Sequence, residues 1–389
     1  MTNILELLKN EKVEWKKLGE VVEILDSKRK PIKKSERIFG NYPYYGANGI
    51  QDYVNDYIFD GTFILMGEDG SVMNKNFTPI LHWIEKDKIW VNNHAHVLGN
   101  SSDCYNLKYI YYYLTTINVS GIVKGTPPKI NQANLRDIEI PIPSLETQEK
   151  IVEILDKFTN YVMELQSELQ SRTKQYTYYR DKLLSQEYLT KVTKEMQEDR
   201  KVNTLRLEEV CEFKRGKRLV KSELQEDGEF PVYQNSIIPL GYYHENNFER
   251  DNTFIISAGA AGEIVYSDRE FWAADDVYVL KTKENITSKY LYYLLLSKQY
   301  IIKSKVRKAS IPRLSKDDIE KILVEIPPLS LQNKIVKVLD KFQVLLADTK
   351  GLIPEEIEQR QKQYEYYREK LLTFDVECSR TNERTNERS

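Results

Sequence analysis

Apolar side chains recur at alternating steps of four and three residues along the stretch between Ser144 and Gln186. This spacing is typical of a helix that lies along another helix, with one apolar seam between them. Pro143 stops any earlier helix, and Ser144 can cap the first turn. At about 1.5 Å per residue, the predicted helix is roughly 60 Å long. Its predicted seam residues are Ile151, Leu155, Phe158, Leu165, Leu169 and Tyr176.

The chain contains a second copy of this stretch. The segment PSLETQEKIVEILDKF, which starts at Pro143, is repeated as PPLSLQNKIVKVLDKF, which starts at Pro327. The later segment KQYTYYRDKLLS, from Lys174, recurs as KQYEYYREKLLT, from Lys362. The repeat predicts a second long helix, which pairs with the first in an antiparallel coiled coil. Its predicted seam residues are Ile335, Leu339, Phe342, Tyr364 and Leu371.

The second copy is longer than the first in its middle. It carries four more residues between Pro327 and Lys362 than the first copy carries between the matching positions. An insertion of four residues is a stutter in a heptad pattern. Gly351 and Pro354 lie in the same region, and an interior proline removes a helical hydrogen bond. We therefore expect the second helix to be kinked or broken between Gly351 and Pro354.

A pattern of strands and turns precedes each long helix. The first contains a turn-rich YPYYGANG segment and the apolar strand TFILM, and the second contains FPVYQN and TFIIS at corresponding places. Each pattern then includes a short helix, YIYYYL from Tyr109 and YLYYLL from Tyr290. The segment from Met1 to about Lys12 resembles the end of a long helix. The N-terminus thus continues the pattern with which the second long helix ends, and we expect a cyclic arrangement of the repeats with pseudo-twofold symmetry.

The predicted fold class is therefore α+β, with two mixed α/β globules separated by the two long helices. The first globule, with an N-terminal helix, is expected in residues 1–143, and the second globule in residues 201–327. The long helices are expected in residues 144–200 and 328–374. Residues 375–389 repeat Thr-Asn-Glu-Arg without apolar side chains, and we expect a disordered tail.

Composition narrows the class of protein. A chain of 389 residues, 41% hydrophobic and 30% charged, can bury more than one core. It has no apolar run long enough to span a membrane and no signal-peptide pattern. Cys104, Cys211 and Cys378 are far apart, as expected of reduced thiols in the cytoplasm. The net charge of −2 argues against a protein that coats nucleic acid indiscriminately.

Motifs for bond chemistry are mostly missing from the sequence. A DNA methyltransferase needs a glycine-rich cofactor loop and an Asn/Asp-Pro-Pro-aromatic motif, and the Pro127-Pro128 pair lacks both flanking residues of that motif. No GKS or GKT phosphate loop is present, which argues against an ATP-driven motor. We therefore expect no catalytic residues and no cofactor bound by this chain.

Two weaker candidates for chemistry remain. His94 and His96 could share one face of a strand and bind a metal, but the second copy has Asp276 and Tyr278 there, so structural roles are favoured. Glu212 and Lys214 resemble the end of a nuclease Glu-x-Lys motif without its upstream Pro-Asp. A solvated strand edge explains this pair more simply, and we expect no metal site.

Basic residues gather with amides, hydroxyls and aromatic rings in loops of both globules. Such side chains can hold phosphates and read base edges. A single charged loop is usually only solvated, but recurrence in both copies favours a role in DNA binding. The candidates in the first globule are Lys28, Arg29, Lys30, Tyr45, Asn48, Lys124, Thr126, Lys129 and Asn131. Those in the second are Arg215, Lys217, Arg218, Tyr233, Asn235, Ser236, Lys305, Arg307, Lys308 and Arg313.

The chain resembles the specificity subunit of type I restriction-modification systems. Three features carry the resemblance: the duplicated helix starts IPIPSLETQEKIVEILDKF and IPPLSLQNKIVKVLDKF, the KQYxYYRxKLL helix ends, and the two differing globules. The resemblance covers nearly the whole chain apart from the tail. It implies that each globule is a target recognition domain that reads one half of a bipartite, asymmetric DNA site.

The resemblance also implies partners. The helices would space the two halves of the site and dock two methyltransferase subunits, which bind S-adenosylmethionine. Restriction/translocase subunits, which combine nuclease activity with ATP-driven translocation and use ATP and magnesium, would join them, with no contact to a membrane. A helix of roughly 60 Å spans on the order of 15 to 20 base pairs, enough to separate two domains on one duplex.

Two alternatives differ in class. The chain could be a coiled-coil scaffold with two β-rich modules that bind something other than DNA, in which case duplex binding by the complex would be absent or insensitive to salt. It could also be a nuclease that uses Glu212 and Lys214. In that case the purified chain would cleave DNA with magnesium alone.

Overall fold

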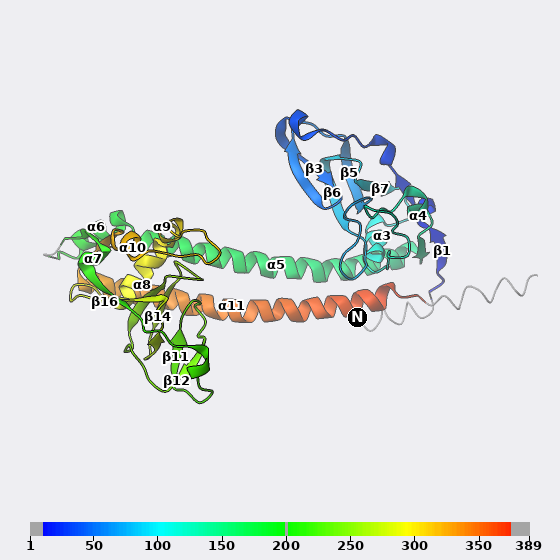
Figure 1. Cartoon of the computed structure of the whole chain (residues 1–389). Helices are drawn as coiled ribbons and strands as arrows, with labels where there is room; N and C mark the ends of the chain where they lie inside the picture. The colour runs from blue at the N-terminus through cyan, green and yellow to red at the C-terminus, as the bar shows by residue number, and fades with distance from the viewer. Residues whose placement is uncertain (1–10, 199–200, 375–389) are drawn as a thin grey trace, which may run out of the picture. The chain divides into compact units, whose positions relative to one another are not determined.

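The computed structural model describes residues 11–198 and 201–374, which form two compact units (Figure 1). The first unit contains the described residues up to Leu165 and those from Glu355 onward, and the second runs from Gln166 to Pro354. Each unit thus holds one globule, the beginning of one long helix and the end of the other. The predicted N-terminal helix falls mostly, and the predicted tail entirely, outside the described residues.

The first globule is built on a six-stranded sheet with the order β2-β7-β5-β6-β3-β4. Neighbouring strands are antiparallel except for β3 and β6, which are parallel. The strands are β2 (Val22–Ile24), β3 (Phe39–Gly46), β4 (Gly49–Val54), β5 (Phe59–Gly67), β6 (Leu81–Val91) and β7 (Ala95–Asn100). The helices are α2 (Leu18–Val21), α3 (Leu107–Leu114) and α4 (Gln132–Arg136), with 3-10 turns η1 (Asp26–Lys28) and η2 (Lys34–Glu36).

The second globule splits its strands between two sheets, β10-β16-β13-β14 and β12-β11-β15. The strands are β10 (Cys211–Arg215), β11 (Phe230–Tyr233), β12 (Gly241–Tyr243), β13 (Asn252–Ile256), β14 (Ile264–Ser267), β15 (Trp272–Ala273) and β16 (Val277–Thr282). The helices are α7 (Leu207–Val210), α8 (Ser288–Ser297), α9 (Gln299–Ser304) and α10 (Lys316–Glu320), with the 3-10 turn η3 (Lys221–Glu223).

A pair of short antiparallel strands closes each globule where it meets the long helices. In the first unit β1 (Glu14–Lys17) pairs with β8 (Glu139–Ile142), and in the second β9 (Asn203–Arg206) pairs with β17 (Leu323–Ile326). The chain therefore enters and leaves each globule at one place. The tyrosine-rich helices α3 and α8 carry the predicted YIYYYL and YLYYLL segments, and both pack into the core between sheet and long helix.

The long helices are α5 (Leu145–Leu183), with 39 residues, and α11 (Leu329–Leu372), with 44 residues. The first is shorter than the predicted range 144–200, because a separate helix α6 (Gln186–Glu195) begins after Ser185, whose hydroxyl caps it. The predicted break between Gly351 and Pro354 is wrong, since α11 runs without interruption through Pro354, whereas the alternative of a kink there stays a prediction. Four inserted residues amount to about one helical turn, so the insertion nearly preserves the apolar face. None of the helices within the described ranges is long and apolar enough to cross a membrane.

The long helices pair in the antiparallel sense that the repeat predicts. In the first unit Phe158, near the start of α5, stacks on Tyr367, near the end of α11, with ring centroids 5.4 Å apart. In the second unit Phe342, near the start of α11, stacks on Tyr179, near the end of α5, at 5.8 Å. Of the predicted seam residues, Ile151, Leu155, Ile335, Leu339 and Leu371 are buried, and Phe158, Leu165, Leu169, Tyr176, Phe342 and Tyr364 are half-buried.

A buried glutamine joins each globule to its long helix. The Gln148 side chain accepts a hydrogen bond from the Asn106 amide at 2.9 Å and donates one to the Pro143 carbonyl at 2.9 Å. Gln332 makes the same two kinds of bond in the second unit. Because both side chains are almost fully buried, these bonds explain why the glutamine recurs in both copies of the helix start.

Replacing Gln332 by alanine should destabilise the second unit. The substitution leaves the Thr287 amide and the Pro327 carbonyl without their partner, and buried groups left unpaired cost about 1–3 kcal/mol each. Denaturant unfolding of the full chain would measure the loss. Asn333→Ala, at the exposed neighbouring position, is the matched control, and an equal loss in both variants would contradict this role for Gln332.

Candidate nucleic-acid interface

The predicted basic loops of the first globule are held by backbone hydrogen bonds to neighbouring strands and turns. The Lys30 amide donates to the Val91 carbonyl at 3.3 Å, and the Asn92 amide donates to the Tyr45 carbonyl at 3.0 Å. The turn after β5 is joined to the loop of residues 124–131, which we call the basic loop, by a bond from the Gly70 amide at 2.9 Å. The Glu68 amide also donates to the His94 carbonyl at 2.9 Å, so five segments that are distant in sequence are joined together.

The second globule repeats this framework bond for bond. The Lys217 amide donates to the Ala273 carbonyl at 2.9 Å, and the Ala274 amide donates to the Tyr233 carbonyl at 2.8 Å. The Gly259 amide donates to the carbonyl of Pro312 at 3.1 Å. The structure therefore matches Lys30 to Lys217, and residues 124–131 to residues 307–315.

A tryptophan supports each of the two matched lysines. The indole N–H of Trp90 donates to the Lys30 carbonyl at 2.6 Å, and that of Trp272 donates to the Lys217 carbonyl at 2.9 Å. Each bond fixes the backbone of a lysine whose side chain is exposed. Sequence reasoning missed these tryptophans. Their equivalent positions in the two copies, in Trp90-Val91-Asn92-Asn93 and Trp272-Ala273-Ala274-Asp275, were a signal that could have identified them.

The loop before each long helix is a short hairpin. Lys124 and Lys129 exchange two backbone hydrogen bonds of 2.9 and 2.8 Å in the first globule, and Arg307 and Arg313 exchange two of 2.8 and 3.2 Å in the second. All four side chains are exposed. Each hairpin thus presents basic groups to solvent from a fixed backbone, which suits contact with phosphates.

Most of the predicted DNA-binding residues are accessible in the structure. Exposed in the first globule are Lys28, Lys30, Asn48, Lys124, Thr126, Lys129 and Asn131. Exposed in the second are Arg215, Lys217, Arg218, Asn235, Arg307, Lys308 and Arg313. Tyr45, Ser236 and Lys305 are half-buried.

Internal contacts give three of the predicted residues structural roles, and two further ones have internal partners, since Asn48 donates to the Ser71 hydroxyl at 2.8 Å and Lys129 pairs with Glu68. The ring of Tyr233 is buried and packs against Phe254, with centroids 4.9 Å apart. The side chain of Asn131 caps α4 by accepting a hydrogen bond from the Asn134 amide at 2.8 Å. Arg29 is only 11% exposed and lies among carboxylates. Tyr233 and Arg29 are therefore not available to DNA in this arrangement, and the Asn131 side-chain oxygen is already in use.

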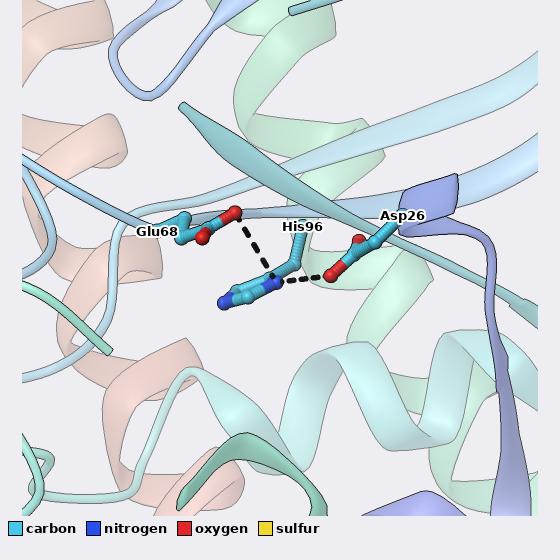
Figure 2. A group of neighbouring side chains, drawn as sticks. All are labelled: Asp26, Glu68 and His96. Atoms are coloured by element: carbon cyan, nitrogen blue, oxygen red, sulfur yellow. Dashed lines mark hydrogen bonds and ion pairs between the residues drawn. The ribbon is translucent and has the colours of Figure 1, made fainter. Parts of the chain in front are cut away.

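The carboxylates around Arg29 belong to a buried network with His96 (Figure 2). The Asp26 carboxylate lies 2.7 Å from His96 Nδ1, and the Glu68 carboxylate lies 3.7 Å from the same nitrogen. The guanidinium of Arg29 pairs with both carboxylates, and Lys129 of the basic loop pairs with Glu68 at 3.0 Å. Opposite charges therefore meet at the base of the candidate interface.

The network keeps its carboxylates ionised. Burial raises the pKa of Asp26, but the hydrogen bond and charge of His96, with smaller contributions from the Val97 amide and Arg29, more than offset this. Burial likewise raises the pKa of Glu68, and Arg29 and Lys129 overcome it. Both pKa values therefore lie below their usual range, so both groups are anions at neutral pH.

Asp26, Glu68 and His96 have their ligand atoms within 4.8 Å of one another, a spacing that could hold a metal ion. However, Arg29 and Lys129 already supply two positive charges to the two carboxylates. The other candidate, His94, points to a different partner, since its ring pairs with Asp69 at an exposed site. The two histidines therefore do not share ligands, and the buried group is built as an ion network.

The pair considered for nuclease chemistry lies on β10. Glu212 and Lys214 form an ion pair with each other, and their side chains are 62% and 50% exposed. Glu212 belongs to no cluster of potential metal ligands among the described residues. This geometry is that of a solvated strand edge.

An exposed aliphatic pair in the second globule escaped sequence reasoning. Ile237 and Ile238 are 52% and 71% exposed in the loop that follows β11, directly after Asn235 and Ser236. Aliphatic side chains can contact the methyl group of thymine in the major groove. The sequence held a signal for this pair: the two isoleucines belong to no alternating strand pattern and stand beside polar residues of a turn.

Comparison with known proteins agrees with the repeated architecture. A family model described as the type I restriction modification DNA specificity domain matches residues 10–175 and again residues 199–359. A relative in Haemophilus influenzae, named as a type I restriction enzyme specificity subunit, is 36% identical over 394 residues, covering 95% of this chain and 97% of the relative. A type I restriction enzyme specificity subunit of Escherichia coli is 28% identical over 406 residues, covering 96% and 97%.

A solved structure shares the fold. The crystal structure of the type I restriction-modification S subunit from M. genitalium has a TM-score of 0.63 with 22% identity, covering 96% of this chain and 99% of that one. The family model matches most of the chain, in two copies that coincide with the two repeats of globule and helix. The chain therefore belongs to the family of type I restriction-modification DNA specificity subunits.

Proposed function

We propose that each globule reads one half of a bipartite, asymmetric DNA site, so that the chain selects the sequence on which a type I restriction-modification complex acts. The observation that carries the proposal is the pair of equivalent loop frameworks. Their backbone bonds match one for one, whereas their exposed side chains differ. Two globules that share a backbone framework but differ in their exposed contact residues suit a DNA site whose two halves differ in sequence.

The contacts with DNA would be divided by chemistry. Exposed lysines and arginines of the hairpins, such as Lys124 and Arg307, would bind phosphates and set the register. Asn48 and Asn235, on the loops beside them, carry the amide groups that can pair with adenine. In the second globule Ile237 and Ile238 would add apolar contact with thymine methyl groups.

The long helices would space the half-sites and dock two methyltransferase subunits, with restriction and translocation subunits joining the complex in the cytoplasm. Continuous helices of 39 and 44 residues support a spacer role. The chain itself would catalyse no reaction. S-adenosylmethionine, ATP and magnesium would be bound by the partner subunits, because the described residues offer an ion network that is already neutralised and an exposed Glu212–Lys214 pair.

Co-expression with the methyltransferase encoded beside it, followed by genome-wide mapping of N6-methyladenine, tests the proposal. We expect methylation at a two-part motif with an unread gap of constant length. The methyltransferase expressed without this chain is the control and should leave the motif unmethylated. A soluble stoichiometric complex that methylates no motif would overturn the proposal in favour of a scaffold that does not bind DNA.

A further inference from the structure

The two ring nitrogens of His96 both face hydrogen-bond acceptors. His96 lies on β7 and is completely buried. Its Nδ1 is 2.7 Å from an Asp26 carboxylate oxygen, and its Nε2 is 2.9 Å from the Ile130 carbonyl oxygen. A carbonyl oxygen only accepts, and the ionised Asp26 carboxylate also only accepts. Both bonds therefore form only when each ring nitrogen carries a proton.

These bonds connect the sheet with the basic loop. Ile130 belongs to the loop, and its neighbour Lys129 pairs with Glu68 at 3.0 Å. The side chain of Gln132, just after the loop, donates to Asp26 at 3.3 Å. Residues 129, 130 and 132 are thus attached to β7 and to the segments that follow β2 and β5, and the Ile130 amide adds a bond to the Glu68 carbonyl at 2.8 Å.

The second globule makes the equivalent backbone bond without the network. There the Leu314 amide donates to the Ser257 carbonyl at 2.8 Å. The positions that match Glu68, His96 and Asp26 hold Ser257, Tyr278 and Arg215. Neither buried carboxylates nor an imidazole are therefore available at those positions to hold the loop of residues 307–315.

We propose that His96 is a positioning residue, protonated on both ring nitrogens, that fixes the basic loop of the first globule and has no counterpart in the second. A neutral imidazole would keep one proton and lose one bond. It would then turn a lone pair either toward the Asp26 carboxylate or toward the Ile130 carbonyl. Either change breaks the bond of the ring to Asp26 or its bond to the loop.

Charged groups of several surrounding segments face or approach His96. Asp26 follows β2 and Glu68 follows β5, and both are anions. Arg29 lies beside both carboxylates and donates to the Ala95 carbonyl at 2.7 Å, while Lys129 approaches Glu68 from the loop. The exposed pair of Asp69 with His94 lies farther out. Two anions and two cations therefore surround the ring.

The network also gives the loop a predicted dependence on acid. The pKa values of Asp26 and Glu68 are lower in the folded chain than in the unfolded chain. Their contribution to stability is therefore complete above the unfolded values of about 3.9 and 4.3 and is lost as the pH falls through the lower folded values.

Hydrogen exchange and NMR on the full chain test this proposal. The chain has four histidines, so labelling them with nitrogen-15 gives few signals, and we expect His96 to show protons on both ring nitrogens at neutral pH. His96→Gln should lower the exchange protection of the Lys129 and Ile130 amides roughly tenfold or more, because buried acceptors lose a charged donor. The loop of residues 307–315 should keep its protection and serves as the internal reference.

His94→Gln is the matched control, because it removes an exposed histidine two residues away and should leave both loops protected. If His96→Gln does not fold, Asp26→Asn replaces it and should both loosen the loop and leave His96 with one ring proton. A single ring proton on His96 in the unaltered chain, or unchanged loop protection in the folded variant, would overturn the proposal.

The consequence for recognition rests on the proposed function and can fail separately. In the methylation assay, His96→Gln should relax the base preference in one half of the motif and leave the other half unchanged. A loosened loop with both halves of the motif intact would refute the loop's part in reading DNA, while the role of His96 in positioning the loop would stand.

Discussion

Replacing Leu339 by aspartate should unfold the second unit. Leu339 lies on α11, is completely buried, and belongs to the same core cluster as Ile335 and Leu294. Truncating a buried leucine to alanine already costs about 2–5 kcal/mol, and burying an unpaired carboxylate costs more. A typical domain is stable by only about 5–15 kcal/mol, so this loss should approach the whole stability of the unit.

Thermal unfolding of the full chain would show this as a lost or strongly lowered transition for the second unit. Leu345→Asp is the matched control, because Leu345 lies on the same helix and is 62% exposed. Substitutions at such surface positions usually change stability by at most about 0.5 kcal/mol. Phe158→Asp should fall between these variants, since Phe158 is half-buried and stacks on Tyr367. Equal unfolding temperatures for Leu339→Asp and Leu345→Asp would show that Leu339 is not part of the buried core of the second unit.

Replacing residues 18–138 by residues 207–322 of the same chain should give a protein whose methylated motif contains two copies of one half-site. The exchange removes the first globule and supplies a second copy of the other one. The cut points are equivalent, because the Leu18 amide donates to the Ile138 carbonyl at 2.7 Å and the Leu207 amide donates to the Ile322 carbonyl at 2.9 Å. The strand pair β1–β8 and both long helices are retained.

The transplanted globule should pack correctly against α5, because the contacts between globule and long helix are the same in both units. Asp156 of α5 pairs with Lys108 of the first globule at 2.9 Å, and Asp340 of α11 pairs with Lys289 of the second at 3.0 Å. The hydroxyl of Tyr112 on α3 also donates to Asp156, and the hydroxyl of Tyr293 on α8 donates to Asp340. In the exchanged chain Lys289 would therefore meet Asp156 instead of Asp340.

Mapping of N6-methyladenine reads the result of the exchange directly. The half-site assigned to the first globule should disappear, and the half-site of the second should occupy both positions. The unaltered chain, mapped in the same host, is the control. Retention of the original motif, or loss of both halves from a folded complex, would contradict the assignment of one half-site to each globule.

The repeats in the sequence determined the plan of the molecule. The apolar steps of four and three predicted both long helices, because helical periodicity depends only on residues that are near one another in the chain. The repeated KQYxYYRxKLL and helix-start segments predicted their antiparallel pairing, and the structure realises it with the matching stacks Phe158 on Tyr367 and Phe342 on Tyr179. The recurrence of basic loops before both helices likewise placed the candidate interface.

Tertiary structure decided which members of those loops are free. Arg29 and Lys30 are neighbours in one basic run, yet Arg29 lies between Asp26 and Glu68 while the Lys30 side chain is exposed. Tyr233 stands in the turn-rich segment predicted to bind DNA, but its ring packs on Phe254. These outcomes depend on Glu68 and Phe254, which lie tens of residues away along the chain, and no local pattern contains them.

The same reason explains the difference at Pro354. A local rule predicts a break in the helix, because proline removes one hydrogen bond and crowds the preceding turn. Pairing along the seam stabilises the helix on both sides of that turn, with Leu346 buried before it and Leu371 after it. Helices in proteins owe most of their stability to such packing, so contacts between distant residues kept α11 continuous where the local sequence predicted an interruption.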